Sequence, residues 1–341
     1  MVKKTFRITT SLDVVESVGK MWGKSLERFP DAIEVAQLFK KNKNLNLIID
    51  PLDVKFLVGS FSNNKPVGGR IAVLPDGKKL TKAYSLFASH LAVHDESSNS
   101  HWDVIFRNPN GKYAYLYTKR KDKASRKEKY RHVEDFSRCL PRLRRNLMNV
   151  LAEDSLALPM LILLKTKMRI GNEMYYLKNH HKGLTTLKKK NISVSGNKIT
   201  FEYLAKDGVP QKTIEVFPMP VIKRLKQVLR KKKPNDFVFT NLSGNPFKDT
   251  DFEKAFEKYC GTQFYPHIVR SEYATSEARK FLNNHRKATK EDVEKIYLKI
   301  ADKLGHKKFS KKLGDWEDSY QVTVHHYIQP EIVEKISRMI S

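Results

Sequence analysis

Cysteine and long apolar segments are scarce in this chain of 341 residues. The two cysteines, Cys139 and Cys260, are far apart and lack the spacing of a metal-binding pair, which favours a reducing compartment. The longest apolar run, residues 156–164, contains a proline and is far shorter than the ~20 residues that a membrane span requires. The N-terminus lacks the apolar block of a signal peptide. We therefore expect an intracellular protein without a membrane segment.

Acidic residues are also few: the chain has 37 Asp and Glu against 65 Lys and Arg, which gives a formal net charge of +28. This excess is larger than solubility requires and predicts nucleic acid as the partner. The sequence has no dense carboxylate cluster, no His/Cys metal-binding spacing and no glycine-rich phosphate loop. We therefore expect neither a metal ion nor ATP nor another cofactor.

The first 120 residues predict an N-terminal domain that contains a small antiparallel sheet. An amphipathic helix is expected at 31–40. Between about 66 and 118, turn signals such as Pro75-Asp-Gly77 and Asn108-Pro-Asn-Gly111 separate short apolar runs. That alternation is typical of antiparallel strands joined by tight hairpins. We place the domain boundary near residue 120.

The segment 119–131 carries eight basic and two acidic residues without apolar periodicity. Two interpretations stay open: a solvated linker, or a basic connector laid along a phosphate backbone. Beyond it, apolar residues from Phe136 to Leu151 recur at helical spacing, and Pro141 would start or kink that helix.

Residues 121–341 predict a mostly helical domain with a small β-hairpin sheet, so the fold class is α+β. Arg169 and Glu173 are four residues apart and would share one face of a helix held in a core by the apolar segment 161–164. Downstream, Asp207-Gly208 is a strong hairpin turn that places Lys206 at the tip of paired strands.

Local end signals define two later helices. Thr289 and Asp292 form a predicted capping box, and Gly305 is the expected stop of that helix, which leaves His306 just past its end. Pro330 is expected to open a final amphipathic helix.

The second half of the chain contains the residue types that a metal-free phosphodiester exchange would require. Such a reaction needs cations and donors for the non-bridging oxygens, a nucleophile, and a proton for the leaving oxygen. The candidates in the second half of the chain are Arg169, Lys206, Arg270, His306 and a tyrosine of the C-terminal segment.

Three motifs resemble the catalytic half of type IB DNA topoisomerases: Met168-Arg-Ile-Gly-Asn-Glu173, Gly183-Leu-Thr-Thr-Leu-Lys188 and Ala205-Lys-Asp-Gly208. Lys129-Tyr130, Phe136 and Leu140-Pro-Arg-Leu-Arg144 also resemble an upstream segment of the small viral and bacterial members. The resemblance covers roughly residues 110–341. It implies an N-terminal sheet-containing domain and a helical catalytic domain that close as a monomeric clamp round double-stranded DNA.

The resemblance also implies a role for each candidate. Arg169 and Arg270 would grip the scissile phosphate, Lys206 would protonate the departing 5′ oxygen, and His306 would donate to a non-bridging oxygen. A tyrosine would form a 3′-phosphotyrosyl link, and its reversal after strand rotation would relax supercoils without ATP or metal. Further DNA contacts are expected from Lys129, Arg142, Arg144, Lys188 and His267.

Tyr327 and Tyr320 are both candidate nucleophiles. Tyr327 leads straight into the terminal amphipathic helix, as the nucleophile of the family does, so we favour it over Tyr320 in the preceding loop. The segment between His306 and Tyr327 is longer than in the small viral enzymes.

One residue departs from the topoisomerase pattern. His267 stands three residues before Arg270, where topoisomerases usually carry lysine, and His-x-x-Arg is instead the pattern of tyrosine recombinases. We predict that His267 takes over the phosphate contact of that lysine. Two alternatives stay open: a recombinase or integrase with the same catalytic residues, and a non-enzymatic DNA-binding protein with this fold. The expected location is on DNA inside a cell, in cytoplasm, nucleoid or nucleus, or in a virion.

Overall fold

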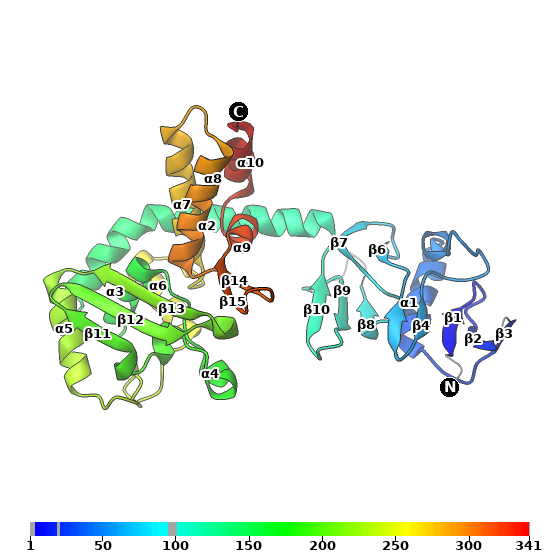
Figure 1. The fold of residues 1–341 in the computed structure, drawn as a ribbon, viewed down its shortest axis with the longest axis horizontal. Coiled ribbons are helices and arrows are strands. Elements are labelled where there is room, and N and C mark those ends of the chain that lie inside the picture. The colour runs from blue at the N-terminus through cyan, green and yellow to red at the C-terminus, as the bar shows by residue number, and fades with distance from the viewer. Residues whose placement is uncertain (1–3, 19–20, 95–100, 341) are drawn as a thin grey trace. The chain divides into compact units, whose positions relative to one another are not determined.

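The computed structural model describes residues 4–18, 21–94 and 101–340 (Figure 1). The chain forms two compact units, 1–128 and 129–341. The division falls within helix α2 (Lys119–Asn149), a few residues beyond the boundary expected near 120. The role of a DNA clamp for the first unit stays a prediction.

The first unit is built from short antiparallel strands and one helix. A five-stranded sheet has the order β3-β2-β1-β4-β5. Its strands are β1 (Thr5–Ile8), β2 (Val14–Val18), β3 (Met21–Lys24), β4 (Ser60–Ser62) and β5 (Lys65–Val67). Two smaller sheets follow, β6 (Ile71–Val73) with β7 (Lys79–Tyr84), and β10 (Tyr113–Leu116), β9 (Val104–Arg107) and β8 (Ser89–Val93) in that order.

The helix of this unit is α1 (Pro30–Lys41), which starts at a proline and turns its apolar face into the core. Val35 and Phe39 of α1 pack with Ile8, Leu57 and other buried side chains. A short 3-10 helix, η1 (Leu45–Ile48), follows it. The predicted helix and the predicted antiparallel hairpins after residue 66 are confirmed.

The basic segment 119–131 belongs to α2, is mostly exposed and spans the division between the two units, so it is a helical connector; its contact with a phosphate backbone stays a prediction. Two features make it helical: Asp122 and Arg126 form an ion pair at i,i+4, and Tyr130 begins a stripe of buried side chains at helical spacing. Pro141 lies inside α2 and does not start it.

The second unit joins a helical core to a small sheet. The strands β11 (Ile192–Ser195), β12 (Lys198–Leu204) and β13 (Pro210–Val216) form an antiparallel sheet in chain order. Helix α3 (Ala157–Thr166) contacts β13 and α5 (Met219–Arg230), and its side chains are almost all buried. This core also includes α6 (Asp249–Cys260), and the predicted mixed α and β fold class is confirmed.

A second core lies between the last helices, which Figure 1 shows side by side in orange and red. Helix α7 (Ile268–Asn284) contacts α8 (Lys290–Leu304) and α10 (Pro330–Arg338). Between α8 and α10 lie the hairpin β14 (Lys307–Ser310) and β15 (Asp315–Asp318) and the short helix α9 (Gln321–His326). No helix in the described ranges combines the length and apolar character needed to cross a bilayer.

Candidate active site

Arg169 lies on a segment without helix or strand structure between α3 and α4 (Glu173–Asn179), so the prediction that it sits on a helix was wrong. Helix α3 ends at Thr166, and the next residue, Lys167, caps it with a left-handed backbone of φ 62°. Asn172 caps α4, because its side chain accepts a hydrogen bond from the Tyr175 N–H at 3.1 Å. The Arg169 segment is therefore bounded by a helix stop and a helix cap.

The glycines of the two motifs let two backbone segments touch. The Leu184 N–H donates to the Arg169 carbonyl at 2.8 Å. A Cβ at Gly183 would lie 2.6 Å from that same carbonyl oxygen, and one at Gly171 would lie 2.3 Å from the Thr186 hydroxyl oxygen. Close packing against the 3-10 helix η2 (Leu184–Thr186) thus fixes the backbone of Arg169.

Arg270 on α7 is buried, with 2% of its surface exposed. Its guanidinium donates to the carbonyls of Lys167 at 2.5 Å and Leu304 at 2.8 Å, and Nη2 lies 2.9 Å from Nε2 of His306. Burial lowers the pKa of Arg270 to about 10, so the side chain stays a cation at neutral pH. A buried positive charge is thereby held in place by backbone dipoles.

His306 lies directly after α8, as predicted. Thr289 and Asp292 form the capping box of that helix, and Gly305 ends it in the left-handed conformation. The Nδ1 atom of His306 is 2.7 Å from the Thr323 hydroxyl. Burial, followed by the charge of Arg270, lowers the pKa of His306 to about 3, so the ring is neutral at physiological pH.

Tyr327 is the tyrosine that the structure brings to the arginines. Its hydroxyl accepts from Nη2 of Arg169 at 3.2 Å, and its ring lies 5.3 Å from the Arg270 guanidinium and 4.8 Å from the His306 ring. Tyr320 instead packs on Tyr297 at 5.8 Å. The Tyr327 side chain is 7% exposed, so the surrounding contacts define its position.

His267 lies directly before α7 and joins this group through Arg169. Its Nε2 is 3.0 Å from Nη1 of Arg169, and its ring stacks on Tyr265 and faces Tyr327. Burial, together with the charges of Arg169 and Arg270, lowers the pKa of His267 to about 3. Because a guanidinium only donates, the neutral His267 ring accepts this hydrogen bond.

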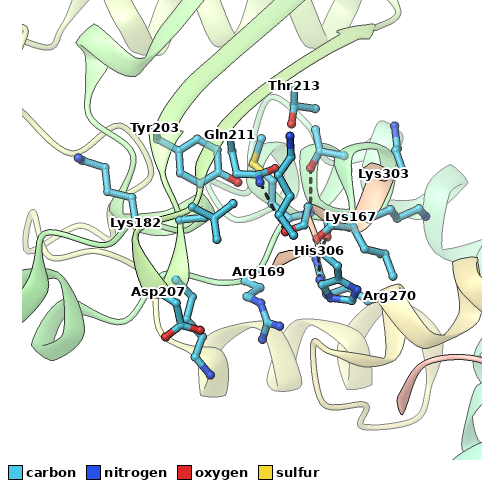
Figure 2. A pocket seen from close by; sticks show the side chains of 18 of the residues that line it. Lys167, Arg169, Lys182, Tyr203, Asp207, Gln211, Thr213, Arg270, Lys303 and His306 are labelled. Atoms are coloured by element: carbon cyan, nitrogen blue, oxygen red, sulfur yellow. Dashed lines mark hydrogen bonds between the residues drawn. The ribbon is translucent and has the colours of Figure 1, made fainter. Parts of the chain in front are cut away.

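Lys206 occupies the predicted hairpin tip, in the turn η4 (Lys206–Gly208) between β12 and β13. Asp207 adopts a left-handed backbone there, with φ 64°. Lys206 is exposed and lines a cavity of about 280 Å³ together with Arg169, Arg270 and His306. Figure 2 shows Arg270 beside His306, with Arg169 and Asp207 along the same cavity.

Comparison with known proteins decides the family. A family model described as eukaryotic DNA topoisomerase I, catalytic core, matches residues 118–315, more than half of the chain. The chain belongs to this family. The matched range includes Arg169, Lys206, Arg270 and His306 and ends before Tyr327. The resemblance to type IB topoisomerases, and with it the assignment as a DNA topoisomerase, is confirmed.

One individual relative carries the name of a DNA topoisomerase. The DNA topoisomerase 1B of Acanthamoeba polyphaga mimivirus is 24% identical over 228 residues, which cover 61% of this chain and 68% of the viral protein. Two crystal structures of the XerH site-specific recombinase are 17% identical, one pre-cleavage with difH and one post-cleavage with palindromic difH. Their TM-scores are 0.36 and 0.37, and the matched regions cover 50% and 59% of this chain. The chain spans about half the length of each recombinase chain, 46% and 52%.

The predicted DNA-contacting residues of this family member are dispersed. Lys129 lies at the site, with Nζ 5.7 Å from the centre of the Tyr327 ring. Arg142 donates to the Cys260 carbonyl, and Arg144 lines a separate cavity of about 600 Å³. Lys188 lies over the Tyr176 ring at 5.2 Å. Their contacts with DNA stay predictions.

Sequence reasoning missed three residues that hold the site together. The Thr323 hydroxyl contacts His306, and the Thr275 hydroxyl contacts the Tyr327 carbonyl at 3.2 Å. The Lys167 carbonyl accepts from Arg270, and burial lowers the pKa of its own ammonium to about 8. The sequence shows only that Thr323 precedes Tyr327 by one helical turn and gives no signal for its contact with His306.

Proposed function

We propose that this topoisomerase cuts one strand of duplex DNA with Tyr327, lets the strand rotate, and reseals it without ATP or a metal. The Tyr327 oxygen would bond to the scissile phosphorus while the bond from phosphorus to the 5′ oxygen breaks. The phenolic proton leaves to solvent, and Lys206 gives a proton to the 5′ oxygen. Attack by the 5′ hydroxyl reverses each step. The observation that carries this proposal is the 3.2 Å hydrogen bond from Arg169 to the Tyr327 hydroxyl.

The arginines supply the charge that this transition state needs. In the part of the chain that the structure describes, neither Arg169 nor Arg270 forms an ion pair with a carboxylate; their partners are neutral side chains and backbone carbonyls. A phosphate next to Tyr327 would therefore meet two guanidinium groups whose charge is not yet neutralised. Charge-assisted hydrogen bonds from such groups strengthen as negative charge grows on the non-bridging oxygens.

Lys206 suits the role of general acid because of its place on the hairpin. The η4 turn presents an exposed, long side chain at the cavity that Arg169 and Arg270 also line. We propose that Lys206 reaches the departing 5′ oxygen when DNA fills this cavity. Its loss would slow cleavage of an ordinary phosphodiester more than that of a bridging 5′-thio substrate, whose sulfur leaves without a proton.

His267 would contact the phosphate through Arg169 or directly. In the DNA-free protein its Nε2 accepts from Arg169, which orients the guanidinium toward Tyr327. We propose that it replaces the lysine usual at this position. If His267→Ala cleaves as fast as a variant of a distant surface residue, this role is wrong.

We further propose that the chain acts as a monomer whose two units enclose duplex DNA. Lys129, Arg142, Arg144 and Lys188 would contact the backbone, and binding would weaken steeply with salt. The protein would work wherever its DNA is held, in cytoplasm, nucleoid, nucleus or virion.

Relaxation of negatively supercoiled plasmid in EDTA and without ATP tests the proposal. Wild type should relax the plasmid, Tyr327→Phe should not, and Tyr320→Phe should behave as wild type. If only Tyr320→Phe abolishes relaxation, the nucleophile is Tyr320 and not Tyr327. If wild type does not relax plasmid but forms a covalent adduct on a suicide substrate, the His267 pattern of a recombinase becomes the better explanation. A protein that forms no adduct would be a DNA-binding protein only.

A further inference from the structure

The buried residue Thr323 joins the two ends of the candidate active site. Its side chain is fully buried on α9, and its hydroxyl oxygen lies 2.7 Å from Nδ1 of His306. Its carbonyl accepts from the N–H of Tyr327 at 2.9 Å. One residue therefore contacts the ring of the histidine and the backbone of the tyrosine.

The hydrogen bonds of His306 define where its proton sits in the DNA-free protein. The Arg270 guanidinium, 2.9 Å from Nε2, has only donors, so Nε2 must accept. The neutral ring then carries its single proton on Nδ1 and donates it to the Thr323 hydroxyl oxygen. In this state His306 has no proton on Nε2 to offer to a phosphate.

Phosphate binding requires the opposite arrangement at Nε2. A ring that donates from Nε2 either holds a second proton, with Nδ1–H still donating to Thr323, or has moved its proton from Nδ1 to Nε2. In the second case Nδ1 becomes an acceptor and needs a donor. A threonine hydroxyl can accept or donate by rotating about its C–O bond, so Thr323 satisfies Nδ1 in every one of these states.

We propose that Thr323 is the positioning residue of His306: it holds the ring in one orientation while Nε2 changes from acceptor of Arg270 to donor of the scissile phosphate. The proposal rests on the proposed function. A purely apolar side chain would fill the same space but leave Nδ1 without a partner. An unpaired polar atom in a buried position is costly, so both the orientation and the protonation of the ring would then be poorly defined.

The test is a double-mutant cycle on cleavage of a suicide duplex in a single turnover. Thr323→Val keeps the shape and removes the hydroxyl, and should slow cleavage on the order of tenfold to a hundredfold. Thr323→Ser keeps the hydroxyl and should cleave within about threefold of wild type. In the His306→Ala background, Thr323→Val should cause no further loss, because Thr323 acts only through the ring.

A packing role gives different results from a positioning role. If Thr323→Val slows the wild type and the His306→Ala enzyme by the same factor, or if it leaves cleavage unchanged while His306→Ala is slow, the proposal is overturned. If the wild type itself neither relaxes plasmid nor cleaves the suicide duplex, the proposed function fails instead.

Nitrogen-15 NMR of wild-type protein without DNA provides a measurement that needs no variant. The His306 ring should show a protonated Nδ1 and an unprotonated Nε2 at pH 7. A proton on Nε2 in that state would overturn the proposal even if every variant misfolds.

Discussion

A single methyl group at Gly183 should displace Arg169. The backbone at Gly183 has φ −137°, which any residue adopts, so the effect of Gly183→Ala is purely one of space. The new Cβ would lie 2.6 Å from the Arg169 carbonyl oxygen and 2.7 Å from the Gly171 nitrogen and the Ile170 carbonyl carbon. Ordinary contact requires the two segments to part by roughly 0.8 Å. Such overpacking should cost about 1–3 kcal/mol in the free energy of unfolding.

The larger effect should be on cleavage, because a displacement of about 1 Å at a catalytic group can cost on the order of a hundredfold in rate. Urea denaturation measures the first effect, and single-turnover cleavage of a suicide duplex measures the second. Gly244→Ala is the matched control: its φ is 82° and nothing lies within 4 Å of the added Cβ. Backbone strain should lower its free energy of unfolding by about 1–2 kcal/mol, and it should cleave as fast as wild type. If Gly183→Ala cleaves as fast as Gly244→Ala, the glycine does not position Arg169.

Two further predictions concern stability. Tyr130→Phe removes a buried hydroxyl that donates to the Ile328 carbonyl at 2.7 Å, next to Tyr327, and should lower the free energy of unfolding by about 1–3 kcal/mol; an unchanged urea midpoint would contradict this. The pKa of His306 is lowered to about 3 by burial and Arg270, so below pH 6.5 the unfolded chain binds a proton that the folded chain does not. Stability should thus fall by about 2 kcal/mol from this residue between pH 7 and pH 5. Between pH 7 and pH 5, the free energy of unfolding of His306→Gln, measured by urea denaturation, should fall by about 2 kcal/mol less than that of wild type. Equal decreases in the two proteins would show that the pKa of His306 is not lowered by folding.

Features encoded by neighbouring residues could be predicted from the sequence. The capping box of Thr289 and Asp292, the stop at Gly305, and the start of α10 at Pro330 are all present as expected. Each depends on hydrogen bonds or backbone preferences within one helical turn. These local signals were enough to place His306 after its helix and Tyr327 before the last one, although nothing local shows that the two rings lie 4.8 Å apart.

The prediction for Arg169 failed because the deciding contacts are distant in sequence. Its spacing to Glu173 fits a helix, but Gly171 packs against Thr186 and the Arg169 carbonyl pairs with Leu184. The same limit applies to Thr323, whose hydroxyl partner is 17 residues away. A sequence pattern shows which residues share a helix face, and tertiary packing determines whether that helix forms.

The arrangement of charge suggests why the site stays assembled without DNA. A buried guanidinium usually needs a carboxylate, yet Arg270 is held by two backbone carbonyls and a neutral histidine, and Arg169 by a second neutral histidine and the Tyr327 hydroxyl. These neutral acceptors orient both arginines without cancelling their charge, so under the proposed function a phosphate would meet donors that are already oriented toward Tyr327. A carboxylate in either position would stabilise the DNA-free protein but would compete with the phosphate for the same donors. The lowered pKa values of His267 and His306 are therefore needed for this arrangement, because a protonated ring would repel the arginines and could not accept hydrogen bonds from them.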